Sequence, residues 1–273
     1  MRIQHNIKSL NTHKSLITND SSEKKNLEKL ASGYRINRAA DDASGLTISE
    51  EMRAQVAGLD QAYENSMNGI ALVETMEGAM EEVHSMLNRM VELSIQSAND
   101  INSEQNRESI QEEVAQLRDE MKRIEDTTNY NGIPLFKGGD ALVLQVAETS
   151  LESSQLEVER PDLSAVNLGI ADLSVETAAD ARAAVSKIEW AVDYISQARG
   201  KVGAYYNRLE YTANNLNEMS TNISASESRI RDVNMAKEEM YRVKNDILGE
   251  SAQAMLAQAN QVPEGVLPLL QQE

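Results

Sequence analysis

The stretch IEWAVDYISQARGKVGAYYNRLEYTANNLNEMSTNISASESRI (residues 188–230) decides the fold, because its aliphatic residues recur at a strict interval of seven. A sustained seven-residue repeat keeps one seam of a helix facing a partner and produces a left-handed supercoil. The residues three positions further on are mostly small, so partner helices can approach closely. The stretch therefore predicts a long coiled-coil helix, and its repeat consists of Ile188, Ile195, Val202, Leu209, Leu216, Ile223 and Ile230.

Upstream of this stretch the apolar spacing is also helical. Helices are predicted over about the first 30 residues, over 46–98 and from Ser103 to about 125, and turn-forming residues at 31–45 separate the first two. Asn131-Gly132 indicates a tight turn. The segments ALVLQVA (141–147) and SSQLEVERP (153–161) are predicted to form a hairpin, the only β structure expected, and residues 161–175 are predicted to be irregular.

Composition excludes several classes of protein. The chain has 273 residues, a net charge of −18 and no cysteine, so it has neither disulfides nor a thiolate site. Residues 41–228 carry a charge of −21, which argues against binding nucleic acid. No stretch approaches the roughly 20 apolar residues that span a bilayer, so membrane insertion is not expected. The first sixteen residues lack the apolar run of a secretory signal, so any export is expected to proceed without a cleaved signal peptide.

The C-terminal end is unusually apolar for so acidic a chain. Residues 248–273 contain only three charges, and Pro263 and Pro268 oppose a long regular helix near the end. A helix that is apolar on most sides must be enclosed, and two terminal helices alone cannot enclose it. Other copies of the chain are expected to supply the remaining cover. The fold expected is mainly α, a long antiparallel coiled-coil or helix-bundle rod with one small β-hairpin region.

The terminal residues expected to make these self-assembly contacts lie on both end helices and in the tail. They are Ile3, Ile7, Leu10, Ile17, Leu27, Leu30, Met240, Val243, Ile247, Leu248, Met255, Leu256, Val266, Leu267, Leu269 and Leu270.

Four separated segments, in order, resemble bacterial flagellin. They are LEKLASGYRINRAADDASGLTISEEMR (27–53), MLNRMVELSIQSAND (86–100), TTNYNGIPLF (127–136) and AMLAQANQVPEGVLPLL (254–270). The similarity covers about the first 140 and the last 100 residues. It implies a structural subunit that polymerises into the flagellar filament for swimming motility, located outside the bacterial cell. Because only about 35 residues separate Phe136 from the returning helical region, the chain resembles a minimal flagellin without variable outer domains.

The resemblance also implies a division of the chain into layers of the filament. Residues 1–33 and 236–273 would form the inner helices of the filament core, residues 34–45 the connector, and residues 46–235 the outer coiled-coil domain with its β-hairpin near 139–160. Implied partners are other copies of the chain, an export chaperone on the C-terminal helix (about 236–258), and the filament cap and hook-junction proteins.

A second implied partner is the flagellin-sensing Toll-like receptor of animal hosts. In agonist flagellins an Arg and a Leu four residues apart, with a Glu on the next helix, form the receptor contact. The resemblance places these roles at Arg89, Leu93 and Glu113, with Leu87, Asn88 and Gln96 beside them. Position 91 departs from the pattern, because it holds Val where many agonists have a second Arg, and this puts the affinity in doubt. The alternative is that these residues pack only against neighbouring subunits.

Other functions remain open or are disfavoured. A hook–filament junction protein, a secreted receptor ligand that does not polymerise, and a cytosolic coiled-coil scaffold are the alternatives. Glu81 and His84 form one Glu-x-x-His motif, but a di-iron bundle needs two such motifs and two further Glu. No phosphate-binding loop or catalytic constellation is present in the sequence, so no enzyme activity, metal or cofactor is expected.

Overall fold

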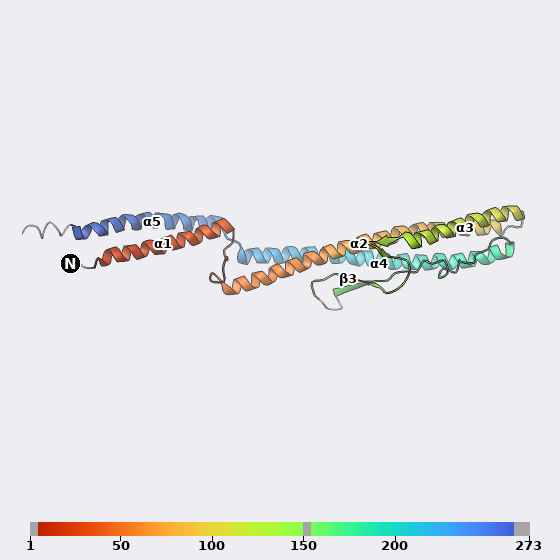
Figure 1. Ribbon diagram of the computed structural model, residues 1–273, viewed down its shortest axis with the longest axis horizontal. Helices are drawn as coiled ribbons and strands as arrows, with labels where there is room; N and C mark the ends of the chain where they lie inside the picture. The colour runs from red at the N-terminus through yellow and green to blue at the C-terminus, as the bar shows by residue number, and fades with distance from the viewer. Residues whose placement is uncertain (1–4, 150–153, 265–273) are drawn as a thin grey trace, which may run out of the picture. The chain divides into compact units, whose positions relative to one another are not determined.

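The computed structural model describes residues 5–149 and 154–264 of a chain that is mainly helical, as predicted (Figure 1). The antiparallel helix bundle with a small β-hairpin region is also confirmed. In chain order, the elements are α1 (Ile7–Ser32), α2 (Ala43–Ser97), α3 (Glu104–Thr127), β1 (Asn129–Tyr130), β2 (Ile133–Pro134), β3 (Leu142–Gln145), β4 (Gln155–Val158), α4 (Ala178–Arg231) and α5 (Met235–Glu264).

The chain forms two compact units. Unit 1 contains the residues up to Ala54 together with those from Asn222 onward, and unit 2 runs from Gln55 to Thr221. The limits of the units lie inside α2 and α4. These limits differ from the predicted boundaries at the 34–45 connector and at residue 235. The predicted division describes layers of a filament, and it stays a prediction.

The core of unit 2 lies where α2, α3 and α4 meet. The predicted seven-residue seam of α4 is buried from Ile188 to Leu216, while Ile223 and Ile230, further along, are only half-buried. Ile110, Val114 and Met121 supply the apolar stripe of α3, and α2 contributes its aliphatic and Met face. With Phe136 as the only Phe in the chain, this core is built almost entirely from aliphatic residues and Met. The fully buried residues of α2 include Met76, Met80, Leu87 and Met90.

The segment 161–175 has no regular helix or strand, as predicted, but it belongs to the core. Five of its apolar side chains are almost completely buried in the core cluster of the three helices, whereas Val166 is 79% exposed. Ser97 at the end of α2 donates to the carbonyl of Val175, and Gln111 of α3 accepts from the Val175 N–H at 2.7 Å. These bonds fix the segment across the ends of α2 and α3. The buried residues are Leu163, Leu168, Ile170, Leu173 and Val175.

Two antiparallel strand pairs are present in the described residues, one more than expected. The predicted hairpin is confirmed, because β3 pairs with β4 with Leu144 opposite Leu156. The second pair, β1 with β2, surrounds the predicted tight turn, whose Asn131 and Gly132 have φ angles of 50° and 80°. Left-handed φ at both positions is the geometry of a two-residue hairpin turn. The expectation of a single hairpin was wrong because strands of two residues leave no alternating pattern in the sequence.

The hairpin of β3 and β4 lies directly on α2 because α2 has a glycine at the contact. A Cβ on Gly69 would lie 2.8 Å from Leu144 Cδ1 and 3.3 Å from Leu209 Cδ1. Asn65, one turn earlier on α2, donates to the carbonyl of Gln145 at 3.2 Å. The hairpin is therefore fixed to the bundle by close packing and by a hydrogen bond.

In unit 1, α1 and α5 lie side by side and antiparallel (Figure 1). The Asn6 side chain donates to the carbonyl of Ala259 at 2.7 Å, so the start of α1 meets the later part of α5. The Asn6 side chain also accepts from the Ser9 N–H and caps α1. A break that was not predicted separates the last two helices, because α4 ends at Arg231 and α5 begins at Met235.

Candidate functional site

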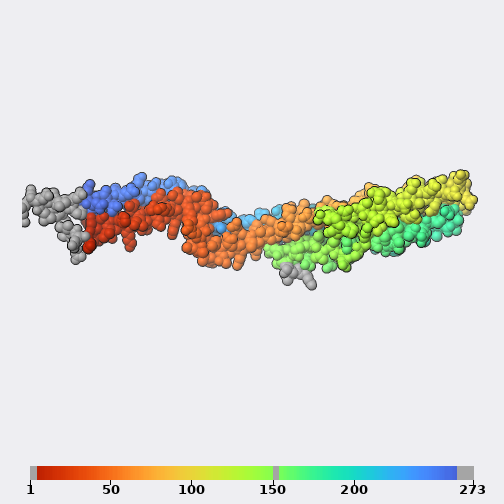
Figure 2. All heavy atoms as spheres, viewed as in Figure 1, coloured from red at the N-terminus to blue at the C-terminus, as the bar shows by residue number. Residues whose placement is uncertain are grey.

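The surface of the α1–α5 pair carries an apolar face that nothing in the described chain covers. We call it the outer face. In Figure 2 the atoms of α1 and α5 lie against each other along the pair. On this face, large aliphatic and Met side chains are between 42% and 66% exposed. They are Ile7, Leu10, Ile17, Leu27, Met240, Val243, Ile247, Leu248 and Met255.

The contact between α1 and α5 has the opposite composition. On α5, the residues at intervals of seven that turn away from solvent are Glu238, Asn245, Ala252 and Ala259, which are polar or small. No residue of α1 is buried. With its amide oriented to satisfy both of its atoms, Asn26 of α1 donates to Glu238 at 3.0 Å and accepts from Asn245 at 3.1 Å. Leu16, Leu30 and Leu256 are also half-buried on these helices, so the pair is joined by a seam of mostly polar and small residues, which we call the polar seam.

This arrangement reverses the usual pattern of a helix pair. Two helices normally bury their apolar stripes against each other and expose polar residues. Here most of the seam is polar or small and most of the large apolar side chains face outward, so much of the apolar area of both helices remains available to a partner. Of the other residues predicted for self-assembly, Leu30 and Leu256 are half-buried. Ile3, Val266, Leu267, Leu269 and Leu270 lie outside the described residues.

The segments that join α1 to α2 and α4 to α5 are tied together within unit 1. The Val233 N–H donates to the carbonyl of Gly33 at 2.9 Å, and Tyr34 and Asp232 form an isolated β-bridge. The Arg231 guanidinium lies 4.9 Å from the centre of the Tyr34 ring and forms an ion pair with Glu50. Only 12% of the Arg231 side chain is exposed. We call this set of contacts the clasp, and it shows that the predicted connector is not a free linker.

Asp41 fixes the conformation of the same connector. Its carboxylate accepts from the backbone N–H groups of Arg38 at 3.1 Å and Asn37 at 3.2 Å. The hydrogen bond from Arg38 is the main reason that the pKa of Asp41 lies below its ordinary value. Asp42 accepts from the Gly45 N–H at 2.9 Å and caps the start of α2.

The residues predicted to contact a receptor form an exposed ionic group where α2 faces α3. The Arg89 guanidinium lies 2.9 Å from a carboxylate oxygen of Glu113 on α3 and 3.0 Å from one of Glu92 on α2. The hydrogen bond to Glu113 raises the pKa of Arg89, which stays charged. Asn88 and Gln96 are exposed on α2. These residues offer a surface of both charges on two neighbouring helices.

Leu87 and Leu93 do not belong to that surface, and the prediction that placed them there is wrong for this chain. Leu87 is fully buried and Leu93 is 2% exposed, because both turn into the core of unit 2. The exposed aliphatic residue of this region is Ile95, at 57%. The exposure of Ile95 was not predicted, because apolar residues are so closely spaced along α2 that the sequence does not show which of them face the core and which face solvent.

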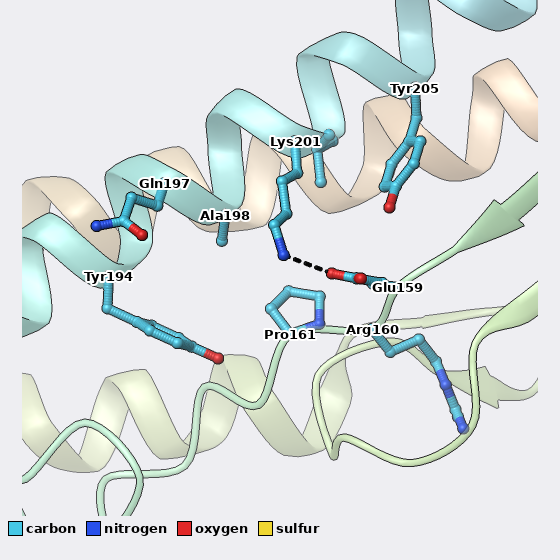
Figure 3. Close-up of a pocket in the computed structure, with 9 residues that line it drawn as sticks. Glu159, Arg160, Pro161, Tyr194, Gln197, Ala198, Lys201 and Tyr205 are labelled. Carbon is cyan, nitrogen blue, oxygen red and sulfur yellow. Dashed lines mark hydrogen bonds and ion pairs between the residues drawn. The ribbon is translucent and has the colours of Figure 1, made fainter.

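A recess of about 170 Å³ opens on α4 of unit 2 (Figure 3). Lys201 points from α4 toward Glu159 and forms an ion pair with it at 2.7 Å. Tyr194 and Tyr205 lie on either side of Lys201, and Pro161 lies beside the Lys201–Glu159 pair. The ion pair with Glu159 raises the pKa of Lys201. This recess could not be predicted from the sequence, because Glu159, Arg160 and Pro161, which line it together with α4, belong to neither a helix nor a strand.

Within residues 5–149 and 154–264, no group of three His, Asp or Glu side chains lies close enough together to hold a metal ion. Glu81 and His84 lie on α2 without a second motif beside them. The helices described also include none that is both long and apolar enough to cross a membrane.

Comparison with known proteins assigns the family. The model of the bacterial flagellin N-terminal helical region matches residues 3–141, and that of the flagellin C-terminal helical region matches residues 185–270. A flagellin of Halalkalibacterium halodurans is 47% identical over 271 residues, which cover 99% of this chain and 100% of the relative. A flagellin of Bacillus subtilis is 41% identical over 303 residues, covering 99% and 100%.

Solved structures agree with this assignment. The chain is similar to the crystal structure of Bacillus cereus flagellin with a TM-score of 0.51 and 27% identity, over 60% of this chain and 94% of that one. A putative flagellar hook-associated protein from Vibrio parahaemolyticus shares the fold with a TM-score of 0.60 at 16% identity, over 70% and 100%. The chain belongs to the bacterial flagellin family and is a structural subunit, not an enzyme, that self-polymerises into the extracellular flagellar filament.

Proposed function

We propose that the outer face of α1 and α5 is the surface through which this subunit joins the filament. The observation that carries the proposal is the reversed pattern of the pair, with a polar seam inside and apolar stripes outside. Burying one Leu, Ile, Val or Met side chain contributes roughly 1.5–3 kcal/mol, and each subunit presents nine such residues on the outer face. Contact with other subunits removes these side chains from water.

Truncation tests this proposal. A chain that ends at Ile247 lacks about half of α5 and the apolar tail but retains all of unit 2. We expect it to keep the helical circular dichroism of α2, α3 and α4 and to form no filaments when seeded. Normal filaments from the truncated chain, seen by electron microscopy, contradict the proposal.

The same outer face is proposed to bind an export chaperone before assembly. Exposed apolar stripes on α5 invite aggregation at high cytosolic concentration, and a helix with one apolar side suits a hydrophobic groove. The filament cap and the hook-junction proteins are proposed to meet the ends of the polymer, where an outer face has no further subunit to cover it. Co-purification of the full chain, but not of the chain ending at Ile247, with an export chaperone tests the first of these partners.

A second function is proposed for the ionic group on α2 and α3, as the contact for the flagellin-sensing Toll-like receptor of hosts. Arg89 supports it, because it is held by Glu92 and Glu113 and is half-exposed, and a fixed Arg is a common anchor of interfaces. The proposal is limited to Asn88, Arg89, Gln96 and Glu113, since the two leucines are buried. The contact is therefore more polar than the resemblance implied, and Val91 lowers the expected affinity.

Matched arginines test the receptor proposal. Arg123 on α3 forms a similar exposed ion pair, with Glu120. We expect Arg89→Ala to weaken binding to the purified receptor ectodomain by about tenfold or more, and Arg123→Ala to leave it unchanged. Equal affinities for Arg89→Ala and the unaltered chain, measured on monomers, refute this second function without affecting the first.

A further inference from the structure

The only tryptophan of the chain lies on the surface of unit 2. Trp190 on α4 is 54% exposed, and its ring stacks on that of Tyr194 with centroids 5.8 Å apart and planes 18° apart. Stacking holds the indole in place and leaves its outer side in water. Phe136, in contrast, is fully buried. Fixed, exposed aromatic rings are typical of the centre of protein interfaces, where Trp and Tyr are enriched.

The aromatic surface continues along α4 into the recess of Figure 3. Tyr194, Ala198 and Tyr205 follow Trp190 at helical spacing, and all three line the recess. We call Trp190, Tyr194 and the recess the aromatic face. It combines a projecting ring with an adjacent hollow of about 170 Å³. A projecting ring beside a hollow can interlock with a complementary protein surface, which a flat surface cannot do.

Charge identifies the partner. The chain carries −18, so copies of it repel each other over most of their surface. The aromatic face departs from this, because its charged residues are Lys201 paired with Glu159, and Arg160. Lys187, Glu189 and Asp193 lie within three residues of Trp190 on α4, and together with Lys201, Glu159 and Arg160 these groups carry no net charge. A second copy of this acidic chain can approach here without the repulsion that it meets elsewhere.

We propose that the aromatic face is a contact between subunits, in which a second copy of the chain covers Trp190. This contact is additional to the outer face of α1 and α5, and it lies in the other unit. Because flagellins polymerise, copies of this chain are close to one another in the filament. Burial of this exposed aromatic face, which carries no net charge, then contributes to association without a cost in repulsion.

Trp190 provides its own reporter, because all tryptophan fluorescence of the chain comes from this one side chain. The experiment compares monomers with seeded filaments of the unaltered chain and measures the emission maximum and quenching by acrylamide. We expect a shift to shorter wavelength and several-fold weaker quenching in the filament. Equal emission and equal quenching in the two samples overturn the proposal, even if sedimentation and electron microscopy show normal filaments.

Substitution provides a second measurement. Because Trp190 is exposed, Trp190→Ala should leave the circular dichroism and the melting temperature of the monomer unchanged. The critical concentration for filament growth should rise about tenfold, the effect of losing an aromatic interface residue. Trp190→Phe retains a ring and should fall between the two. An unchanged critical concentration for Trp190→Ala overturns the proposal.

Discussion

Substitution of Ile247 by Ala isolates the contribution of the outer face to assembly. Ile247 is 61% exposed on α5, so about six-tenths of its surface remains to be buried by a partner. Complete burial of such a side chain contributes roughly 1.5–3 kcal/mol, and the remaining part therefore contributes about 1–2 kcal/mol per subunit. Since each 1.4 kcal/mol is a factor of ten, we expect the critical concentration of Ile247→Ala to rise about 5- to 30-fold.

The assay is sedimentation of seeded filaments over a series of subunit concentrations. The monomer should keep its melting temperature, because the side chain is mostly exposed and Ala has the higher helix propensity. Gln253 is the matched control. It is exposed on α5 six residues further on, which places it on another side of the helix. Gln253→Ala should assemble like the unaltered chain. If Ile247→Ala also does so, within twofold, the outer face does not carry the assembly.

Three further predictions concern unit 1 and the helix that enters it. Arg231→Ala removes the ion pair with Glu50 and the contact with an aromatic ring, and should lower the stability of the clasp by about 1–2 kcal/mol in urea denaturation; an unchanged midpoint contradicts this. Gly45→Ala places a Cβ 2.5 Å from a carboxylate oxygen of Asp42 and should lower the free energy of unfolding by about 1–3 kcal/mol. Gly78→Ala meets no atom within 4 Å and should stabilise α2 by about 0.5–1 kcal/mol. The melting temperatures of the two variants should therefore move in opposite directions. The pKa of Asp41 is lower in the folded chain, so its contribution to the free energy of unfolding is complete above the ordinary Asp pKa of 3.8 and is lost as pH falls through the folded pKa. Asp41→Asn should therefore make stability fall less steeply at acid pH. A dependence on acid pH identical to that of the unaltered chain argues against this role.

The helices of unit 2 could be predicted because each buries one apolar stripe. The interval of seven from Ile188 to Leu216 marks a seam that is buried in the structure. The irregular segment 161–175 was predicted as irregular, but its place in the core was not. Its buried residues follow no helical or alternating period, so their burial depends on contacts with distant helices.

The polar seam of unit 1 could not be found by searching for apolar stripes. The apolar residues of α1 and α5 do follow a helical period, but this period marks the side that faces solvent in the monomer. The signal that identifies the seam is the interval of seven from Glu238 through Asn245 and Ala252 to Ala259. Contacts between helices are usually apolar, so these four residues of α5 could be assigned to the contact only after the structure showed where α1 lies.

The ionic group on α2 was predicted in part. Arg89 and Glu113 were placed on neighbouring helices by resemblance, and they lie 2.9 Å apart in the structure. The two leucines were transferred with them as surface residues, although the apolar spacing of α2 is broad enough to leave the edge of its buried side undefined. Burial at that edge is set by α3 and α4, which pack over it.

Methionine oxidation tests most directly whether the outer face is covered only in the filament. Met240 and Met255 are 66% and 53% exposed on α5, and Met80 is fully buried in unit 2 as an internal control. Peroxide converts exposed Met to the sulfoxide, which mass spectrometry locates by residue. The account predicts fast oxidation of Met240 and Met255 in the monomer, several-fold slower oxidation in the filament, and slow oxidation of Met80 in both. Equal rates for Met240 and Met255 in monomer and filament would contradict it.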